Sequence, residues 1–250
     1  MATVSDDTAN AGTTPVEMSP RVLHQTDRSL IVYFKKFLSF EMQKTLLEGT
    51  SKSIEWRKEV DDFGVQDRES FYMGDDPSCI FSYVGLELTP NEWNLDCRTV
   101  RDMLNASIAP YVSKRLQIEE KECRVTACLM NYYRKGEGMI PWHWDEVRAH
   151  GIGKVVASVS LGGPRPFELK TRCAVDINDG RGDGDQVTNI LSLTLEPGSV
   201  LLMAGDAQEE YLHRLPLPDD APERISLTMR SIVPGFETGL KKKKVNVHET

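Results

Sequence analysis

The chain has 250 residues, of which 40% are hydrophobic and 27% charged, and its formal net charge is −8. These values are typical of one globular domain, and no apolar run approaches the ~20 residues that a membrane span needs. The acidic balance argues against a broad duplex-DNA footprint, because phosphate contact requires clustered Lys and Arg. A local basic groove, a nucleotide-sized substrate, a protein or a small molecule all stay open.

The chain divides into one domain and two tails. Residues 1–20 are rich in Thr, Ala, Ser and Asp and carry few large apolar side chains, which is typical of a disordered tail. We expect the domain over residues 21–236 and a basic, flexible tail over residues 237–250. Within that tail, Lys241–Lys244 suits a nuclear-import signal, a weak phosphate contact or a solvated end.

The cysteines and the N-terminus indicate the compartment. The five cysteines form no CxxC pair and are odd in number, which argues against a disulfide framework and against a cysteine-rich zinc site. The N-terminus lacks the basic and apolar regions of a secretory signal. We expect reduced thiols in an intracellular compartment, the cytoplasm and/or the nucleus. We also expect a monomer without membrane association.

The first half of the domain mixes strands with two helices. Residues 30–34 predict a strand, and Ser39 is placed to cap a short amphipathic helix after it. From 56 to 83, polar and aromatic residues recur without a helical period, which predicts strands joined by exposed turns. Apolar residues at helical spacing predict a helix over 96–116, which Pro110 should bend or interrupt.

Beyond residue 123 the apolar period becomes that of strands. An extended run over 125–133 places Asn131 and Tyr133 on one face, and glycines then end it. Further strands are expected at 155–161, from Phe167 onwards, at 191–195, at 200–203 and at 224–230. Between two of them, the Asp- and Gly-rich residues 174–190 predict a polar loop.

The segment NYYRKGEGMIPWHWDE, residues 131–146, places His143 and Asp145 two residues apart. On an extended segment, residues i and i+2 point to the same side, so an imidazole and a carboxylate can become neighbouring ligands of one metal. A second histidine from elsewhere would complete two nitrogens and one oxygen, which suits non-haem Fe(II) with open coordination positions. For so short a motif, a chance match on a solvated loop is the alternative.

The strand over residues 224–230 has one apolar and one polar face. The apolar face holds Ile225, Leu227 and Met229, and the polar face holds Arg224, Ser226, Thr228 and Arg230. Two arginines buried on one face are costly without anions; their Cα atoms lie about 20 Å apart at ~3.3 Å per residue, so both side chains can reach one small dicarboxylate. Taken alone, an edge strand with its polar face in water fits equally well. Taken with His143 and Asp145, an anion site beside a metal is favoured.

Together these segments resemble an AlkB-type member of the Fe(II)- and 2-oxoglutarate-dependent dioxygenases. The resemblance runs from about Tyr72 to Arg230 and depends on the order and spacing of its pieces. These are Tyr72-Met73-Gly74-Asp75, residues 85–90, Asn131-Tyr132-Tyr133, His143-Trp144-Asp145, residues 157–162, residues 165–168, Pro197-Gly198, His213-Arg214 and residues 224–230. It implies a mainly β fold with flanking helices (α+β) and a double-stranded β-helix, or jelly-roll, core.

Carried over residue by residue, the resemblance implies that His143, Asp145 and His213 hold the iron. The residues it implies around 2-oxoglutarate are Asn131, Tyr133, Arg224, Ser226 and Arg230, with Arg224 at the distal carboxylate and Ser226 beside it. O₂ is then the second co-substrate, and succinate and CO₂ are released.

The activity that the resemblance implies is oxidative demethylation of N-alkylated bases in single-stranded nucleic acid. An unpaired base needs a pocket and aromatic stacking rather than a long duplex footprint, and we place Tyr72, Phe81 and Glu146 at that pocket. The alternative is an oxygenase of the same fold acting on a small molecule or a protein side chain. The net charge, the lack of an obvious basic stripe, and Val147 and Arg148 after Glu146 favour it. A metal-binding protein without turnover would lack a ligand or an arginine, and all are present.

Overall fold

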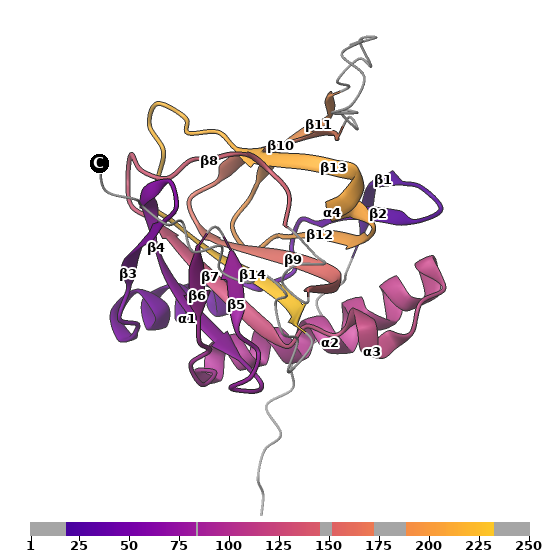
Figure 1. Ribbon diagram of the computed structural model, residues 1–250, viewed down its shortest axis with the longest axis horizontal. Coiled ribbons are helices and arrows are strands. Elements are labelled where there is room, and N and C mark those ends of the chain that lie inside the picture. Colours follow the sequence, from indigo (N-terminus) through magenta and orange to yellow (C-terminus); the bar gives the residue numbers. More distant parts are fainter. Residues whose placement is uncertain (1–18, 84, 146–151, 173–188, 233–250) are drawn as a thin grey trace, which may run out of the picture.

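The structure, a computed structural model, describes residues 19–83, 85–145, 152–172 and 189–232 (Figure 1). The strands are β1 (Arg21–Gln25), β2 (Ser29–Phe34), β3 (Arg57–Asp61), β4 (Gly64–Gly74), β5 (Phe81–Tyr83), β6 (Leu86–Leu88), β7 (Ala127–Tyr133), β8 (Ile140–His143), β9 (Ile152–Gly162), β10 (Arg165–Thr171), β11 (Asn189–Leu195), β12 (Val200–Gly205), β13 (Tyr211–Leu215) and β14 (Arg224–Ile232). The helices are α1 (Phe40–Ser53), α2 (Leu95–Leu116), α3 (Glu120–Cys123) and α4 (Ala207–Glu210). Most of the expected N-terminal tail, most of the polar loop and the lysine run lie outside these ranges.

Two antiparallel sheets form the core. One has the strand order β1-β2-β12-β9-β14-β7-β4-β3, and the other has the order β11-β10-β13-β8. Their facing side chains form one buried cluster, in which Leu129 and Leu201 of the larger sheet accompany Phe167 and Leu169 of the smaller one. The opposite face of the larger sheet is covered by α1 and α2, which lie along it in Figure 1. The expected mainly β fold with flanking helices and a jelly-roll core is confirmed.

The helices begin where the sequence indicates. The Ser39 hydroxyl accepts a hydrogen bond from the backbone N–H of Met42 at 3.2 Å and caps α1. Asn94 caps α2 in the same way. Of the expected bend or interruption at Pro110, the interruption is wrong, because α2 is continuous over 22 residues. Pro110 faces solvent, whereas Ile108 and Val112 on either side of it are buried against the sheet, and this packing holds the helix together.

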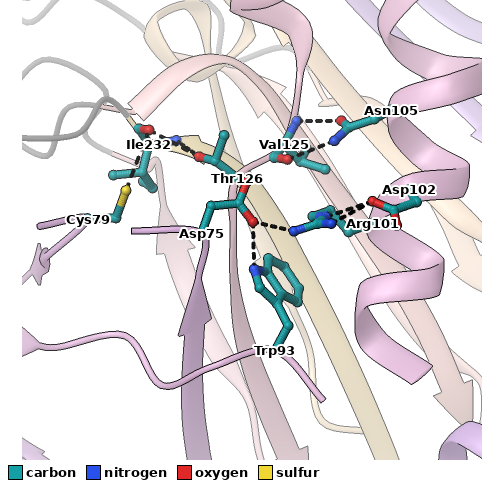
Figure 2. Close-up of polar contacts among 9 residues, drawn as sticks. All are labelled: Asp75, Cys79, Trp93, Arg101, Asp102, Asn105, Val125, Thr126 and Ile232. Atoms are coloured by element: carbon teal, nitrogen blue, oxygen red, sulfur yellow. Dashed lines mark hydrogen bonds and ion pairs between the residues drawn. The ribbon is translucent and has the colours of Figure 1, made fainter. Parts of the chain in front are cut away.

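The ends of the central strands are tied to α2 and to one another (Figure 2). The Thr126 hydroxyl accepts a hydrogen bond from the backbone N–H of Ile232 at 2.8 Å and donates to its carbonyl at 3.0 Å. The Asn105 side chain pairs in the same reciprocal way with the backbone of Val125, at 2.8 and 3.0 Å. The start of β7 and the end of β14 are therefore fixed by side chains that hydrogen-bond to backbone N–H and C=O groups at these strand ends.

A second tie joins the end of β4 to the same helix. Asp75 accepts a hydrogen bond from the indole N–H of Trp93 at 2.7 Å and forms an ion pair with Arg101 on α2 (Figure 2). In the described part of the chain, four cysteines are free and buried, and the fifth, Cys173, lies outside it. None of the helices within the described ranges has the length and apolarity to cross a membrane.

Candidate metal centre and anion pocket

The candidate metal ligands lie between the two sheets, in a cavity of about 600 Å³. β8 and β13 are antiparallel neighbours, and His143 is directly opposite His213. Asp145 follows β8 two residues after His143. One ligand atom from each of the three residues lies within 4.8 Å of the others. The structure therefore brings together the three side chains singled out in the sequence, two by strand pairing and one by the i, i+2 spacing.

The charge states of these side chains suit a divalent cation. Burial, together with His143 and Arg230, lowers the pKa of His213 to about 3, and burial also lowers the pKa of His143. Burial acts to raise the pKa of Asp145, but Arg230 and the two histidines outweigh it and bring that pKa to about 2. At neutral pH the set is two neutral imidazoles and one carboxylate. The buried His213 Nδ1 has no hydrogen-bond partner, so this donor set fits the implied Fe(II).

Asp145 is held from two sides. Its carboxylate accepts hydrogen bonds from Arg230 at 2.9 Å (Nη2) and 3.2 Å (Nε). Its backbone N–H donates to the side-chain oxygen of Gln208 at 2.9 Å, and the Gln208 amide in turn contacts the Met203 sulfur at 3.5 Å. Arg230 is therefore shared between Asp145 and any anion that its unpartnered Nη1 can reach. Gln208 carries no sequence signal, because a lone buried amide belongs to no motif.

The expected 2-oxoglutarate residues are cross-strand neighbours. Arg224 on β14 is opposite Tyr133 on β7, and Ser226 is opposite both Asn131 on β7 and Ser160 on β9. One lattice of paired strands therefore presents the whole set to the cavity, which all of these residues except Ser160 line.

Arg224 is a buried cation whose bonding is incomplete. Its Nη2 donates to the hydroxyls of Ser160 at 3.1 Å and Ser226 at 3.2 Å, while its Nε has no partner. Burial lowers its pKa to about 10; Tyr133 opposes this shift and Arg165 adds to it. The side chain is thus still charged at neutral pH. A buried guanidinium with an unpartnered N–H fits a pocket for an anion such as a carboxylate.

The three expected substrate residues are placed differently. Phe81 lines the cavity, with the Arg230 guanidinium 4.8 Å from its ring and the Tyr83 ring stacked on it at 5.1 Å. Tyr72 is not among the lining residues: it is buried, its hydroxyl donates to the Cys79 carbonyl at 2.8 Å, and its ring packs on Phe81. Its extended-strand position turns it to the inner face, where β5 covers it, so it supports Phe81. Glu146 lies outside the described residues.

Arg68 is a cavity residue for which no role was predicted. It lines the cavity from β4, and its Nε donates to the Asn131 side-chain oxygen at 2.8 Å. In the sequence it is one polar residue within the aromatic run over residues 56–83. Its position on the same strand face as the buried Gln66 and Ser70 was the available signal, and this signal became specific only when β4 was paired with β7.

Two histidines and a carboxylate at the mouth of a jelly-roll, beside buried arginines, define a mononuclear non-haem iron oxygenase with an anionic cosubstrate. The sequence profile of the 2OG-Fe(II) oxygenase superfamily matches residues 30–230, and the chain belongs to this superfamily. It is thereby a 2-oxoglutarate-dependent dioxygenase that requires Fe(II), 2-oxoglutarate and O₂. The resemblance to the AlkB type is confirmed by the relatives described next.

Two curated relatives are similar over most of the chain. "DNA oxidative demethylase ALKBH2" of Arabidopsis thaliana is 28% identical over 218 residues, which are 81% of this chain and 66% of that protein. Human "Alpha-ketoglutarate-dependent dioxygenase alkB homolog 3" is 25% identical over 219 residues, which are 85% of this chain and 69% of that protein. The chain thus spans about two thirds of the length of these relatives. A solved structure, "The structure of OsALKBH1", is 18% identical with a TM-score of 0.49, covering 80% of this chain and 96% of that one.

Proposed function

We propose that the protein removes methyl groups oxidatively from N-alkylated bases in single-stranded nucleic acid. The observation that carries this proposal is a cavity of about 600 Å³, which has room for a base beside the cosubstrate; the ligand set and aromatic rings lie on its wall, and cations pack on two of its tryptophans. In this proposal His143, Asp145 and His213 hold Fe(II). The names of the two relatives, a DNA oxidative demethylase and an alkB homologue, support the same reaction.

The chain's own residues would place the reactants. Arg224, with Ser226 and Tyr133, binds the distal carboxylate of 2-oxoglutarate, and Asn131 and Arg230 lie toward its other end. When bound, Fe(II) with 2-oxoglutarate and O₂ would supply the oxidant for hydroxylating an N-methyl group to N–CH₂OH, and succinate and CO₂ would be released. The N–C bond of that hemiaminal then breaks to give N–H and formaldehyde. Arg230 and Gln208 keep Asp145 from rotating, so that the ligand set stays fixed while the base is held by aromatic contacts.

Two tryptophans that line the cavity, Trp142 and Trp144, have cations packed on their rings; these two residues together with Lys170, Arg172 and Arg214 are called the rim below. The Lys170 ammonium lies 4.3 Å and the Arg214 guanidinium 4.7 Å from the Trp142 ring centroid. The Arg172 guanidinium lies 3.8 Å from that of Trp144. These cations come from β10, the residue after it, and β13, so they form no stripe in the sequence. The rim is the local positive surface that a single-stranded polyanion requires on a protein of net charge −8.

Removing two rim cations is expected to weaken oligonucleotide binding and its salt dependence. For the Lys170→Ala/Arg214→Ala double variant, the slope of log K against log salt should fall by about 1.4, at ~0.7 per lost contact with a single strand. Fluorescence anisotropy with a labelled methylated single-stranded oligonucleotide measures this. The matched control is Lys121→Ala on α3, whose side chain is exposed and pairs with Glu119. Equal slopes in wild type and double variant would mean that the oligonucleotide binds along another surface of the protein.

The reaction itself is tested by release of formaldehyde and succinate. Wild-type protein with Fe(II) and 2-oxoglutarate is offered methylated single-stranded oligonucleotides, methylated nucleosides, peptides and candidate metabolites. We expect the oligonucleotides to stimulate both products at low salt and to lose this effect as salt rises. If no oligonucleotide couples to 2-oxoglutarate consumption at any salt, the substrate is a small molecule or a protein side chain.

A further inference from the structure

Arg165, the first residue of β10, is a buried cation that lies outside the cavity wall. It is 1% exposed and is one of the largest fully buried side chains of the described residues. Its guanidinium donates to the backbone carbonyls of Gly138 at 3.1 Å, Glu137 at 3.3 Å and Pro222 at 3.1 Å. A buried charge solvated by backbone carbonyls fixes those carbonyls in place, because releasing any of them leaves the cation less compensated.

The carbonyls belong to two loops that join the halves of the site. Residues 134–139 connect β7, which carries Asn131 and Tyr133, to β8, which carries His143. Residues 216–223 connect β13, with its histidine, to β14, with its arginines. The two loops also contact each other directly through a hydrogen bond of 2.9 Å from the Gly136 N–H to the Ala221 carbonyl. Arg165 therefore holds both connections between the histidine strands and the anion-pocket strands.

The first of these loops is packed against the Tyr133 ring. Gly138 has a φ of +83°, and a Cβ at that position would lie 2.1 Å from Tyr133 Cδ1. The guanidinium carbons of Arg165 and Arg224 lie 5.5 and 5.3 Å from the centroid of the same ring. Arg165 also contributes to the lowered pKa of Arg224, because the two positive charges repel each other. Tyr133 thus lies where the loop, Arg165 and Arg224 meet.

We propose that Arg165 is a positioning residue that sets the affinity for 2-oxoglutarate. By holding the loop over residues 136–138 against Tyr133, it fixes the Tyr133–Arg224 pair where the distal carboxylate binds. Its own charge adds to the positive field of that end of the pocket. This inference depends on the proposed role of Arg224 and Tyr133 as the 2-oxoglutarate site, and it assigns a function to a side chain that touches neither cosubstrate nor metal.

A matched pair of glycine variants tests the loop. Gly136 and Gly138 both have a positive φ, +75° and +83°, so alanine strains the backbone similarly at each. At 138 the new Cβ meets the Tyr133 ring, whereas at 136 nothing lies within 4 Å. We expect Gly138→Ala to raise the Kd for 2-oxoglutarate about 10- to 100-fold, the effect of one lost charge-assisted hydrogen bond. Gly136→Ala should leave it nearly unchanged. Calorimetric titration of Mn(II)-loaded protein gives the Kd without turnover.

Variants of Arg165 test the cation itself. Arg165→Met removes the donors and the charge, and we expect the same rise in Kd, with Mn(II) affinity and kcat at saturating 2-oxoglutarate retained. Arg165→Lys keeps the charge but lacks the planar guanidinium, so its Kd for 2-oxoglutarate should lie between those of wild type and Arg165→Met. A merely structural role would instead lower melting temperature, metal affinity and kcat together. If Arg165→Met does not fold, Arg165→Lys and Gly138→Ala decide the matter.

Two negative results are distinguishable. Wild-type protein that binds 2-oxoglutarate, combined with folded Gly138→Ala and Arg165→Lys variants that bind it equally well, would overturn the inference and leave the proposed function standing. Wild-type protein that binds Mn(II) but no 2-oxoglutarate would overturn the proposed cosubstrate site and the inference with it.

Discussion

Replacing His143 or His213 by alanine is expected to abolish succinate formation while the domain still folds. Each change removes one of three protein ligands, and two remaining ligands hold Fe(II) too weakly for turnover. Both rings line a cavity rather than the apolar core, so little packing is lost. Mn(II) binding should fall in parallel with activity, and a chelator should silence the wild type.

Asp145→Ala should lose the metal in the same way but also lose stability. Its carboxylate is the partner of buried Arg230, and breaking a buried pair from one side costs about 3–5 kcal/mol. The melting temperature of Asp145→Ala should therefore be lower than those of the two histidine variants. His24→Ala is the control, since this histidine bonds to Tyr211 from β1 and is not a cavity residue. Wild-type turnover in either histidine variant would refute the assignment of the ligands.

The second large effect is expected at Arg224. Arg224→Met should raise the 2-oxoglutarate requirement at least about 30-fold, because truncating one side of a buried, hydrogen-bonded charge pair costs roughly 2–5 kcal/mol. Without cosubstrate the same variant should be no less stable than wild type, since methionine replaces a buried cation whose Nε has no partner. The measured contrast is the rise in melting temperature on adding 2-oxoglutarate, which wild type should show and the variant should lose.

Arg214→Met is the matched control for this experiment. It removes an arginine from the rim, where Arg214 pairs with Glu168 on the neighbouring strand, and should leave the 2-oxoglutarate response intact. A variant at Arg224 that keeps the wild-type requirement would mean that the cosubstrate carboxylate binds to another cation of the cavity wall, Arg68 or Arg230.

The strands and helix caps were predictable because their signals are local. Strict alternation over residues 224–230 places Arg224 and Arg230 on one buried face, as the structure has them, and Ser39 caps the helix that follows it. Pairing is not local. The lattice that brings Ser160 beside Arg224 joins β9 to β14, more than 60 residues apart, and no period in either strand encodes it.

The same limit explains the residues that had no sequence signal. Arg165 resembles any arginine near a turn until the loops that its guanidinium contacts are known. Lys170 and Arg172 lie more than 40 residues before Arg214 in the sequence, so the three rim cations form no basic cluster there. The net negative charge of the chain therefore gave no sign of a local positive surface. Pro110 shows the converse: a strong local signal for a break is outweighed by burial of the residues around it.

The division of the site between two sheets has a consequence for heat inactivation. His143 and His213 are opposite each other in the smaller sheet, whereas Tyr133 and Arg224 are opposite each other in the larger one. No strand of one sheet pairs with a strand of the other among the described elements, so loops, side-chain packing and side-chain contacts such as Arg230–Asp145 set their separation. On warming, we expect the sheets to shift apart before either ladder breaks, because local openings occur at free energies below that of global unfolding. Iron would then stay bound to its histidines, but 2-oxoglutarate would no longer bind. Activity would therefore fall at a temperature where both sheets are still folded.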